Sequence, residues 1–194
     1  MHEIANAILK GEDYSIPAGI EPFIANVLAL IAQIESKYPV VVASELDLDV
    51  SLQKLVEDGK GMNFQGRIDA VFRDGAGNHL IVDWKTDRDT GNASTHRQQL
   101  QSYRHAYSIS AGIPREKIKV AIGFVGLRGR VNIGRNRAIL DLMQPQDSAF
   151  ETFRRKVGRV LRWKNDPDSF LDELGEGSDD LICRAVQEQY ELET

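Results

Sequence analysis

Three short stretches of this chain combine residue types that bind metal ions and phosphates. Asp69 ends the stretch Gly66-Arg-Ile-Asp69, and Asp83 and Lys85 follow on the next predicted strand. On a strand, residues i and i+2 point to the same face, so Asp83 and Lys85 project together while Trp84 points away. The tight hairpin between the strands predicts a register that pairs residues near 69 with residues near 83. Because adjacent strands lie about 5 Å apart, the two carboxylates can share one cation.

The chemistry that suits two carboxylates and an amine is metal-assisted hydrolysis of a phosphate ester. Two acids in one partly buried spot repel each other, which raises a pKa unless a cation lies between them. Mg²⁺ takes oxygen ligands and lowers the pKa of a bound water. A lysine two residues from a ligand can orient that water or stabilise the transition state. The alternative is a surface Asp–Lys pair, which the apolar character of the strand disfavours because an unpaired charge is costly there.

Taken together, the motifs resemble those of a known nuclease superfamily. Gly66-Arg-Ile-Asp69, Asp83-Trp-Lys85-Thr86 and Gln99-Leu-Gln-Ser-Tyr103-Arg-His-Ala106 are similar to the motifs of PD-(D/E)XK nucleases. They are most similar to the RecB-type branch, the nuclease domain at the C-terminus of RecB and AddA helicase–nucleases. The resemblance spans roughly residues 2–125.

This resemblance implies a ligand set and a catalytic group. It implies Mg²⁺ or Mn²⁺ at Asp69 and Asp83, with the backbone carbonyl of Trp84 as a further ligand. It also implies that Lys85 is the catalytic lysine. Family members with an iron–sulfur cluster use four cysteines, and this chain has one, so no such cluster is expected.

Four further residues enter through the same resemblance. Gln99 and Tyr103, one turn apart on a helix, would face the site and position the nucleic-acid backbone. RecB-type nucleases carry a metal-binding histidine on their first helix, and His2 is the candidate here; the alternative is a terminal residue without a role. Glu45 lies where the family often carries a glutamate. It either accepts a hydrogen bond near the metal, binds a second ion, or is a solvated strand residue.

The remaining histidines are not expected to be ligands. They lie in polar surroundings with no second ligand at a suitable spacing, so each is predicted to be a solvated surface residue: His79, His96 and His105.

Apolar periodicity and turn residues predict the elements that position the site. Helices are expected at residues 2–10, Glu21–Lys37 and Thr95–Ala111, from Asp147 or Ser148 to about Trp163, and around Ser169–Leu174 and Asp179–Glu191. The second helix has an apolar stripe of Phe23, Val27, Leu28, Ile31 and Ile34. Strands are expected at Val40–Val50, Phe64–Arg73, His79–Lys85, Lys117–Val125 and Arg137–Met143.

This order of elements predicts an α/β fold with a mixed central sheet of about five strands flanked by helices. The third strand is apolar throughout and should be central, and the fifth should be an edge strand. The resemblance implies a restriction-endonuclease-like core. We expect one nuclease domain over residues 1–194, with a core at about 2–143 and a C-terminal helical extension at about 147–191.

Composition sets wider bounds. The chain of 194 residues is 42% hydrophobic and 27% charged, as in ordinary globular proteins, and its net charge of −5 neither favours nor excludes nucleic-acid binding. No apolar run is long enough to span a membrane, and a cytoplasmic location is the default. The chain begins inside an amphipathic pattern, which indicates a fragment of a longer helicase–nuclease; a short natural N-terminus is the alternative.

The sequence therefore predicts a Mg²⁺- or Mn²⁺-dependent deoxyribonuclease of the RecB type, expected to act as an exonuclease in DNA repair and recombination. Its substrate would be DNA, in particular single-stranded ends delivered by a helicase domain in the same or a partner chain. One alternative is a catalytically silent nucleic-acid-binding or scaffolding module, which the intact Asp69, Asp83 and Lys85 disfavour. A site-specific endonuclease is the other, and no added recognition element is evident for it.

Overall fold

The computed structural model describes residues 2–57, 59–128, 136–143, 147–166 and 168–169. The chain divides into two compact units, Met1–Phe153 and Arg154–Thr194, with the boundary inside α4 (Asp147–Asn165). The helical segments predicted beyond residue 169 lie outside the described residues. The helices of the described part lack the length and apolar composition that a membrane crossing requires.

A mixed five-stranded sheet forms the centre of the first unit, with the strands in the order β1-β2-β3-β4-β5. Their bounds are β1 (Val40–Ser51), β2 (Asn63–Arg73), β3 (His79–Lys85), β4 (Ile118–Arg128) and β5 (Asn136–Met143). Only the β3–β4 pair is parallel among these. The predicted α/β class, the central position of β3 and the edge position of β5 are therefore confirmed.

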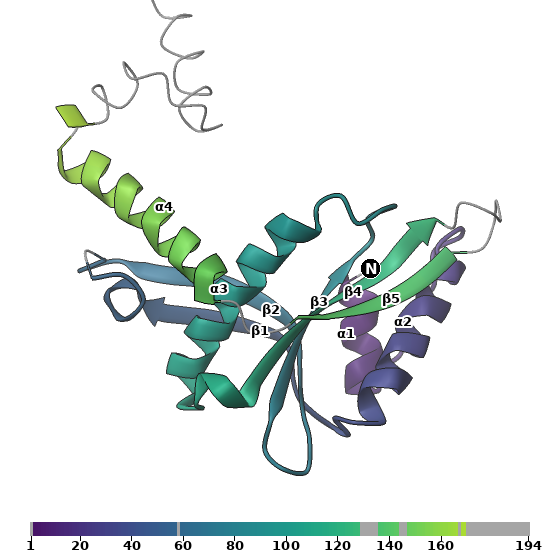
Figure 1. Ribbon diagram of the computed structural model, residues 1–194. Helices are drawn as coiled ribbons and strands as arrows, with labels where there is room; N and C mark the ends of the chain where they lie inside the picture. Colours follow the sequence, from purple (N-terminus) through teal and green to yellow (C-terminus); the bar gives the residue numbers. More distant parts are fainter. Residues whose placement is uncertain (1, 58, 129–135, 144–146, 167, 170–194) are drawn as a thin grey trace, which may run out of the picture. The chain divides into compact units, whose positions relative to one another are not determined.

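Helices cover both faces of this sheet (Figure 1). Helices α1 (His2–Lys10) and α2 (Glu21–Glu35) pack against one face, and α3 (Ala93–Ala111) lies on the other. The apolar side chains of β3 that face α1 and α2 join one buried cluster: Ala5, Val27, Leu30, Ile31, Ile34, Tyr38, Ala70, Phe72, Leu80, Val82, Trp84, Ala121 and Val125. The alternate residues of β3, including Asp83 and Lys85, consequently face α3.

The sheet forks at Asp69. Strand β2 pairs with β1 from Arg73 to Asn63, along its whole length. It pairs with β3 only from Arg73 to Ala70. Beyond this point β1 and β2 continue as a two-stranded ribbon that has separated from β3, so residue 69 lies at the branch.

The prediction that the histidines are solvated is wrong for two of them. His79 is 7% exposed and His105 is 5% exposed. The Tyr107 hydroxyl lies 3.0 Å from Nδ1 of His79, and the His105 ring stacks on Phe150 with 3.4 Å between ring centroids. His79 is buried because α3 crosses the sheet above it and provides the Tyr107 hydroxyl as a polar partner. His105 lies on α3 itself and is covered by Phe150 of α4.

The predicted apolar stripe of α2 is wrong at one position. Leu28 is 45% exposed, and Ile24 and Leu30 are buried in addition to Val27. The buried face of the helix is therefore rotated relative to the predicted stripe, so that Leu28 lies at its solvent side.

The burial of His79 predicts a pH-dependent stability. Burial, together with the charge of Arg73, lowers the pKa of His79 below its ordinary value. The unfolded chain then binds a proton that the folded chain resists, so stability falls as the pH drops below about 6.5. We expect His79→Gln to flatten this part of the profile, measured by urea unfolding between about pH 5 and pH 8.

Tyr107→Phe is the matched control for this prediction. It removes the hydroxyl beside His79 but keeps the buried imidazole, so its stability should still fall on acidification. A wild-type profile that matches the His79→Gln profile throughout this range would contradict the assignment.

Candidate active site

At the point where the β2–β3 ladder ends, the side chain of Asp69 takes the place of a backbone hydrogen-bond partner. The last pair of that ladder is Ala70 with Val82, and extending the register by one residue would place Asp69 across from Asp83. The backbone N–H of Trp84 donates a 2.8 Å hydrogen bond to Oδ2 of Asp69. This carboxylate therefore satisfies a strand donor that the fork would otherwise leave without a ladder partner.

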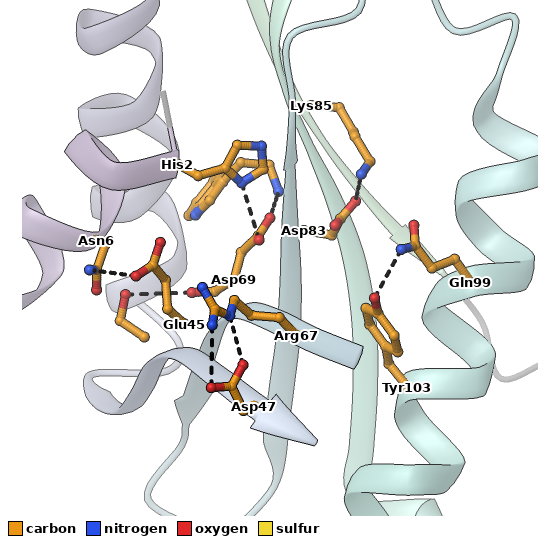
Figure 2. Close-up of polar contacts among 12 residues, drawn as sticks. His2, Asn6, Glu45, Asp47, Arg67, Asp69, Asp83, Lys85, Gln99 and Tyr103 are labelled. Atoms are coloured by element: carbon orange, nitrogen blue, oxygen red, sulfur yellow. Dashed lines mark hydrogen bonds and ion pairs between the residues drawn. The ribbon is translucent and has the colours of Figure 1, made fainter. Parts of the chain in front are cut away.

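His2 is the second partner of Asp69. Its Nδ1 lies 3.1 Å from Oδ1 of Asp69, while the side chains are 48% and 13% exposed respectively. The hydrogen bond to Asp69 raises the pKa of His2, and the negative charges of Asp69 and Asp83 act in the same direction. Helix α1 thus brings its first residue to the branch point of the sheet, as Figure 2 shows.

Asp83 is a buried carboxylate with one close cationic partner. Its side chain is 7% exposed, and Nζ of Lys85 lies 2.7 Å from its Oδ2. Burial raises the pKa of Asp83 above its usual range, whereas the hydrogen bond and charge of Lys85 lower it and the charge of Asp69 raises it again. A nearby positive charge therefore decides whether the Asp83 carboxylate is protonated or ionised.

Trp84 lies between these two residues in the chain but faces the opposite side of the sheet. Its ring is buried, at 1% exposure, and it packs over Gly123 of β4. A Cβ at Gly123 would lie 2.4 Å from the Trp84 ring, so glycine is required for this packing. The tryptophan fixes β3 from the side of α1 and α2, and Asp83 is thereby directed toward α3.

The polar pair of α3 rests on β2. Nε2 of Gln99 donates to the Tyr103 hydroxyl at 3.0 Å. The ring of Tyr103 lies against the backbone of Gly66, where a Cβ would come within 2.6 Å of Cε1. It also meets the Phe64 ring edge-on, with 6.2 Å between centroids. Figure 2 shows Gln99 and Tyr103 across from the Asp83–Lys85 pair.

Glu45 occupies a strained position beside Asp69. It lies between two residues of β1 that pair with Ala70 and Ile68, which places it across from Asp69. Its φ is 53°, the only positive value at a non-glycine residue in the described part of the chain. Nδ2 of Asn6 donates a 3.0 Å hydrogen bond to Oε2 of Glu45, so α1 holds this side chain as well.

The three strands thus align acidic residues across the fork, and their carboxylates have different partners. Asp69 contacts His2 and the Trp84 N–H, Asp83 contacts Lys85, and Glu45 contacts an amide. Within the described residues, no group of three or more His, Cys, Asp or Glu side chains is arranged to hold a metal ion. The arrangement combines oxygen donors for a hard cation with an ammonium group beside them.

Comparison with known proteins identifies the family. The model of the PD-(D/E)XK nuclease superfamily matches residues 11–183, which is most of the chain. This chain belongs to the PD-(D/E)XK nuclease superfamily. The mixed sheet with flanking helices is consistent with the restriction-endonuclease-like fold of this superfamily. The matched region begins after His2.

Other comparisons add little to this assignment. No curated protein matches the chain. The crystal structure of SSO0001 is similar at 19% sequence identity and a TM-score of 0.41, and the match covers 78% of this chain and 63% of that one. The chain therefore spans less than two thirds of the length of SSO0001.

The nuclease fold brings an additional pair of side chains to the same side of the sheet, which sequence reasoning missed. Nε2 of His96 lies 3.2 Å from Oδ2 of Asp87. His96, predicted to be a solvated surface residue, is therefore paired with a carboxylate, and its side chain is 16% exposed. The spacing of nine residues across a loop gives no periodic signal, and only the packing of that loop against α3 creates the pair.

The contact between Tyr103 and Gly66 gives a testable consequence for this nuclease domain. Gly66→Ala inserts a methyl group against the Tyr103 ring and should lower the free energy of unfolding by about 1–3 kcal/mol. Gly75→Ala is the matched control, because a Cβ there meets no atom within 4 Å. Both are measured by urea denaturation.

A double-mutant cycle tests the cause of this effect. In a Tyr103→Ala background the ring is absent, so Gly66→Ala should cost much less than it does in the wild type. An equal cost in both backgrounds would show that the ring contact is not the reason.

Proposed function

We propose that this domain is a metal-dependent DNA nuclease of the RecB type, which hydrolyses phosphodiester bonds at DNA ends. The observation that carries the proposal is the register of β2 and β3. It sets Asp69 across from Asp83 at the fork of the sheet, with Lys85 on the same face as Asp83. Two carboxylates and an ammonium group in this relation suit a divalent cation and a scissile phosphate.

By their chemistry the donors suit Mg²⁺ or Mn²⁺, although within the described residues the side chains would have to draw together around the ion. Asp69, Asp83 and the carbonyl of Trp84 would supply oxygen ligands, and His2 a nitrogen. In an extended strand the N–H and C=O of one residue point toward the same neighbour. Since the Trp84 N–H reaches Asp69, its carbonyl is directed to the same edge. A buried carboxylate whose pKa is raised by burial also favours a cation beside it.

When bound, the cation would lower the pKa of a coordinated water and neutralise negative charge on the phosphate. Lys85 would then orient the attacking water through its ammonium N–H groups, since its stem keeps the group beside Asp83. Lys85 would be free to leave Asp83 for this role if a cation took its place as the positive partner of the carboxylate. His2 would release Asp69 in the same way.

Gln99 and Tyr103 would hold the DNA backbone across from the carboxylates. Their amide and hydroxyl groups are already joined, and the ring of Tyr103 is fixed against Gly66. This paired arrangement on α3, with the motif order of the chain, supports the RecB branch. On that basis we assign single-stranded ends as the substrate, exonucleolytic cleavage in DNA repair and recombination as the activity, and a helicase as the partner that delivers the strand.

Cleavage of labelled single- and double-stranded DNA tests the proposed function. We expect wild-type protein to degrade DNA with Mg²⁺ or Mn²⁺ and to stop in EDTA. Asp83→Ala and Lys85→Ala should each lower the rate by about 100-fold or more, because one removes a ligand and the other the group that orients water. The ladder of products separates exonuclease from endonuclease action.

Asp47→Ala is the matched control. Asp47 is exposed on β1 and pairs with Arg67, so its removal should leave the cleavage rate unchanged. If no metal supports cleavage, calorimetric titration with Mn²⁺ distinguishes between two explanations. Binding that Asp83→Ala abolishes would indicate a nuclease that depends on its partner, whereas no binding would favour the silent nucleic-acid-binding module.

A further inference from the structure

The Asp87–His96 pair lies beside the candidate active site and has no part in the proposed mechanism so far. His96 is in the first turns of α3, three residues before Gln99 and seven before Tyr103. Residues at these spacings share one face of a helix. The histidine therefore belongs to the same polar stripe of α3 that the nuclease motifs place over the site.

Contacts with the sheet place the His96 ring near Lys85. The ring packs at an angle against Phe124 of β4, with 6.4 Å between centroids. Phe124 is the direct neighbour of Lys85 in the parallel β3–β4 ladder, so the two side chains share a face. The charge of His96 also lowers the pKa of Asp83, by less than burial, Lys85 and Asp69 change it.

The loop that carries Asp87 is fixed by its own contacts. The carbonyl of Thr86 packs so closely on Gly126 that a Cβ there would lie 2.3 Å from it. The Asp87 carboxylate accepts from Nδ2 of Asn92 at 3.4 Å through one oxygen and contacts Nε2 of His96 at 3.2 Å through the other. The side chains of His96 and Asp87 remain 16% and 25% exposed, which is enough for a substrate atom to reach the imidazole.

We propose that His96, oriented by Asp87, is the general acid that protonates the departing oxygen during phosphodiester cleavage. This inference rests on the proposed function. With Nε2 held by Asp87, Nδ1 is the ring nitrogen left to face the substrate. The carboxylate fixes the orientation of the imidazole ring through its contact with Nε2.

The step balances as follows in atoms and charge. Water loses a proton to the solvent and its oxygen forms a bond to phosphorus, while the bond from phosphorus to the departing oxygen breaks. The departing oxygen takes the proton from His96 and leaves as a hydroxyl group. The neutral imidazole then regains a proton from solvent, so the net reaction is the addition of one water across the phosphodiester bond.

Substitution of sulfur for the departing oxygen tests this role. The ends of the wild-type products identify which oxygen departs, and an oligonucleotide with sulfur at that bridging position is then prepared. A thiolate leaves without protonation, so it does not require a general acid. We expect His96→Gln to slow cleavage of ordinary DNA by about 100-fold or more and to cleave the sulfur-bridged substrate at close to the wild-type rate.

Two further variants keep the test decisive. Asp87→Asn preserves side-chain shape and should show a smaller loss on ordinary DNA, again without loss on the sulfur-bridged substrate. Thr95→Ala, an exposed neighbour on α3, should behave as wild type on both. Circular dichroism and Mn²⁺ titration establish that each variant is folded and binds metal, so a loss of either is separated from a loss of proton transfer.

Each outcome has a distinct meaning. Equal losses of His96→Gln on both substrates, or no loss on ordinary DNA, would overturn the general-acid role and leave the proposed function intact. Wild-type protein that cleaves neither substrate with Mg²⁺ or Mn²⁺ would overturn the role of His96 in the isolated domain, and the Mn²⁺ titration described above would then separate a nuclease that depends on its partner from a silent module.

Discussion

The hairpin between β2 and β3 sets the register on which the candidate site depends. One oxygen of Asp74 accepts the backbone N–H groups of Ala76 and Asn78 at 2.9 and 2.8 Å, and the other accepts the Asn78 amide at 2.7 Å. These bonds hold the pKa of Asp74 below its usual range. A slip of one residue in the ladder would turn Asp83 to the face occupied by Trp84. The Asp74 turn, although distant from the site, therefore determines which face of the sheet Asp83 occupies.

Burial of charge at Asp83 explains why the site requires a cationic partner at all times. In a poorly solvated environment a lone carboxylate is costly, and the cost is met by Lys85 in this structure. The same environment strengthens any attraction to a divalent cation and to the phosphate it binds. In the proposed mechanism Lys85 would serve both the buried carboxylate and the attacking water, which would link the stability of the resting fold with catalysis.

Much of the fold and part of the site could be predicted because the signals were local. A short turn rich in Asp, Gly and Asn fixes which residues pair, and the apolar run of β3 marks a central strand. The burial of His79 and His105 could not be predicted, because it depends on where α3 crosses the sheet and on the packing of Phe150 from α4 against His105. The positive φ of Glu45 and the pairing of Asp87 with His96 likewise arise from tertiary packing, and no periodic pattern records them.

The fork of the sheet has a mechanical consequence. Asp83 is fixed within a strand that has neighbours along both edges, whereas Asp69 lies where the β1–β2 ribbon departs from that body. The ribbon would bend relative to the rest of the sheet at the branch, where the hydrogen bond from the Trp84 N–H to Asp69 connects the two parts. A nucleic-acid strand that bends the ribbon would change the spacing of the two carboxylates directly.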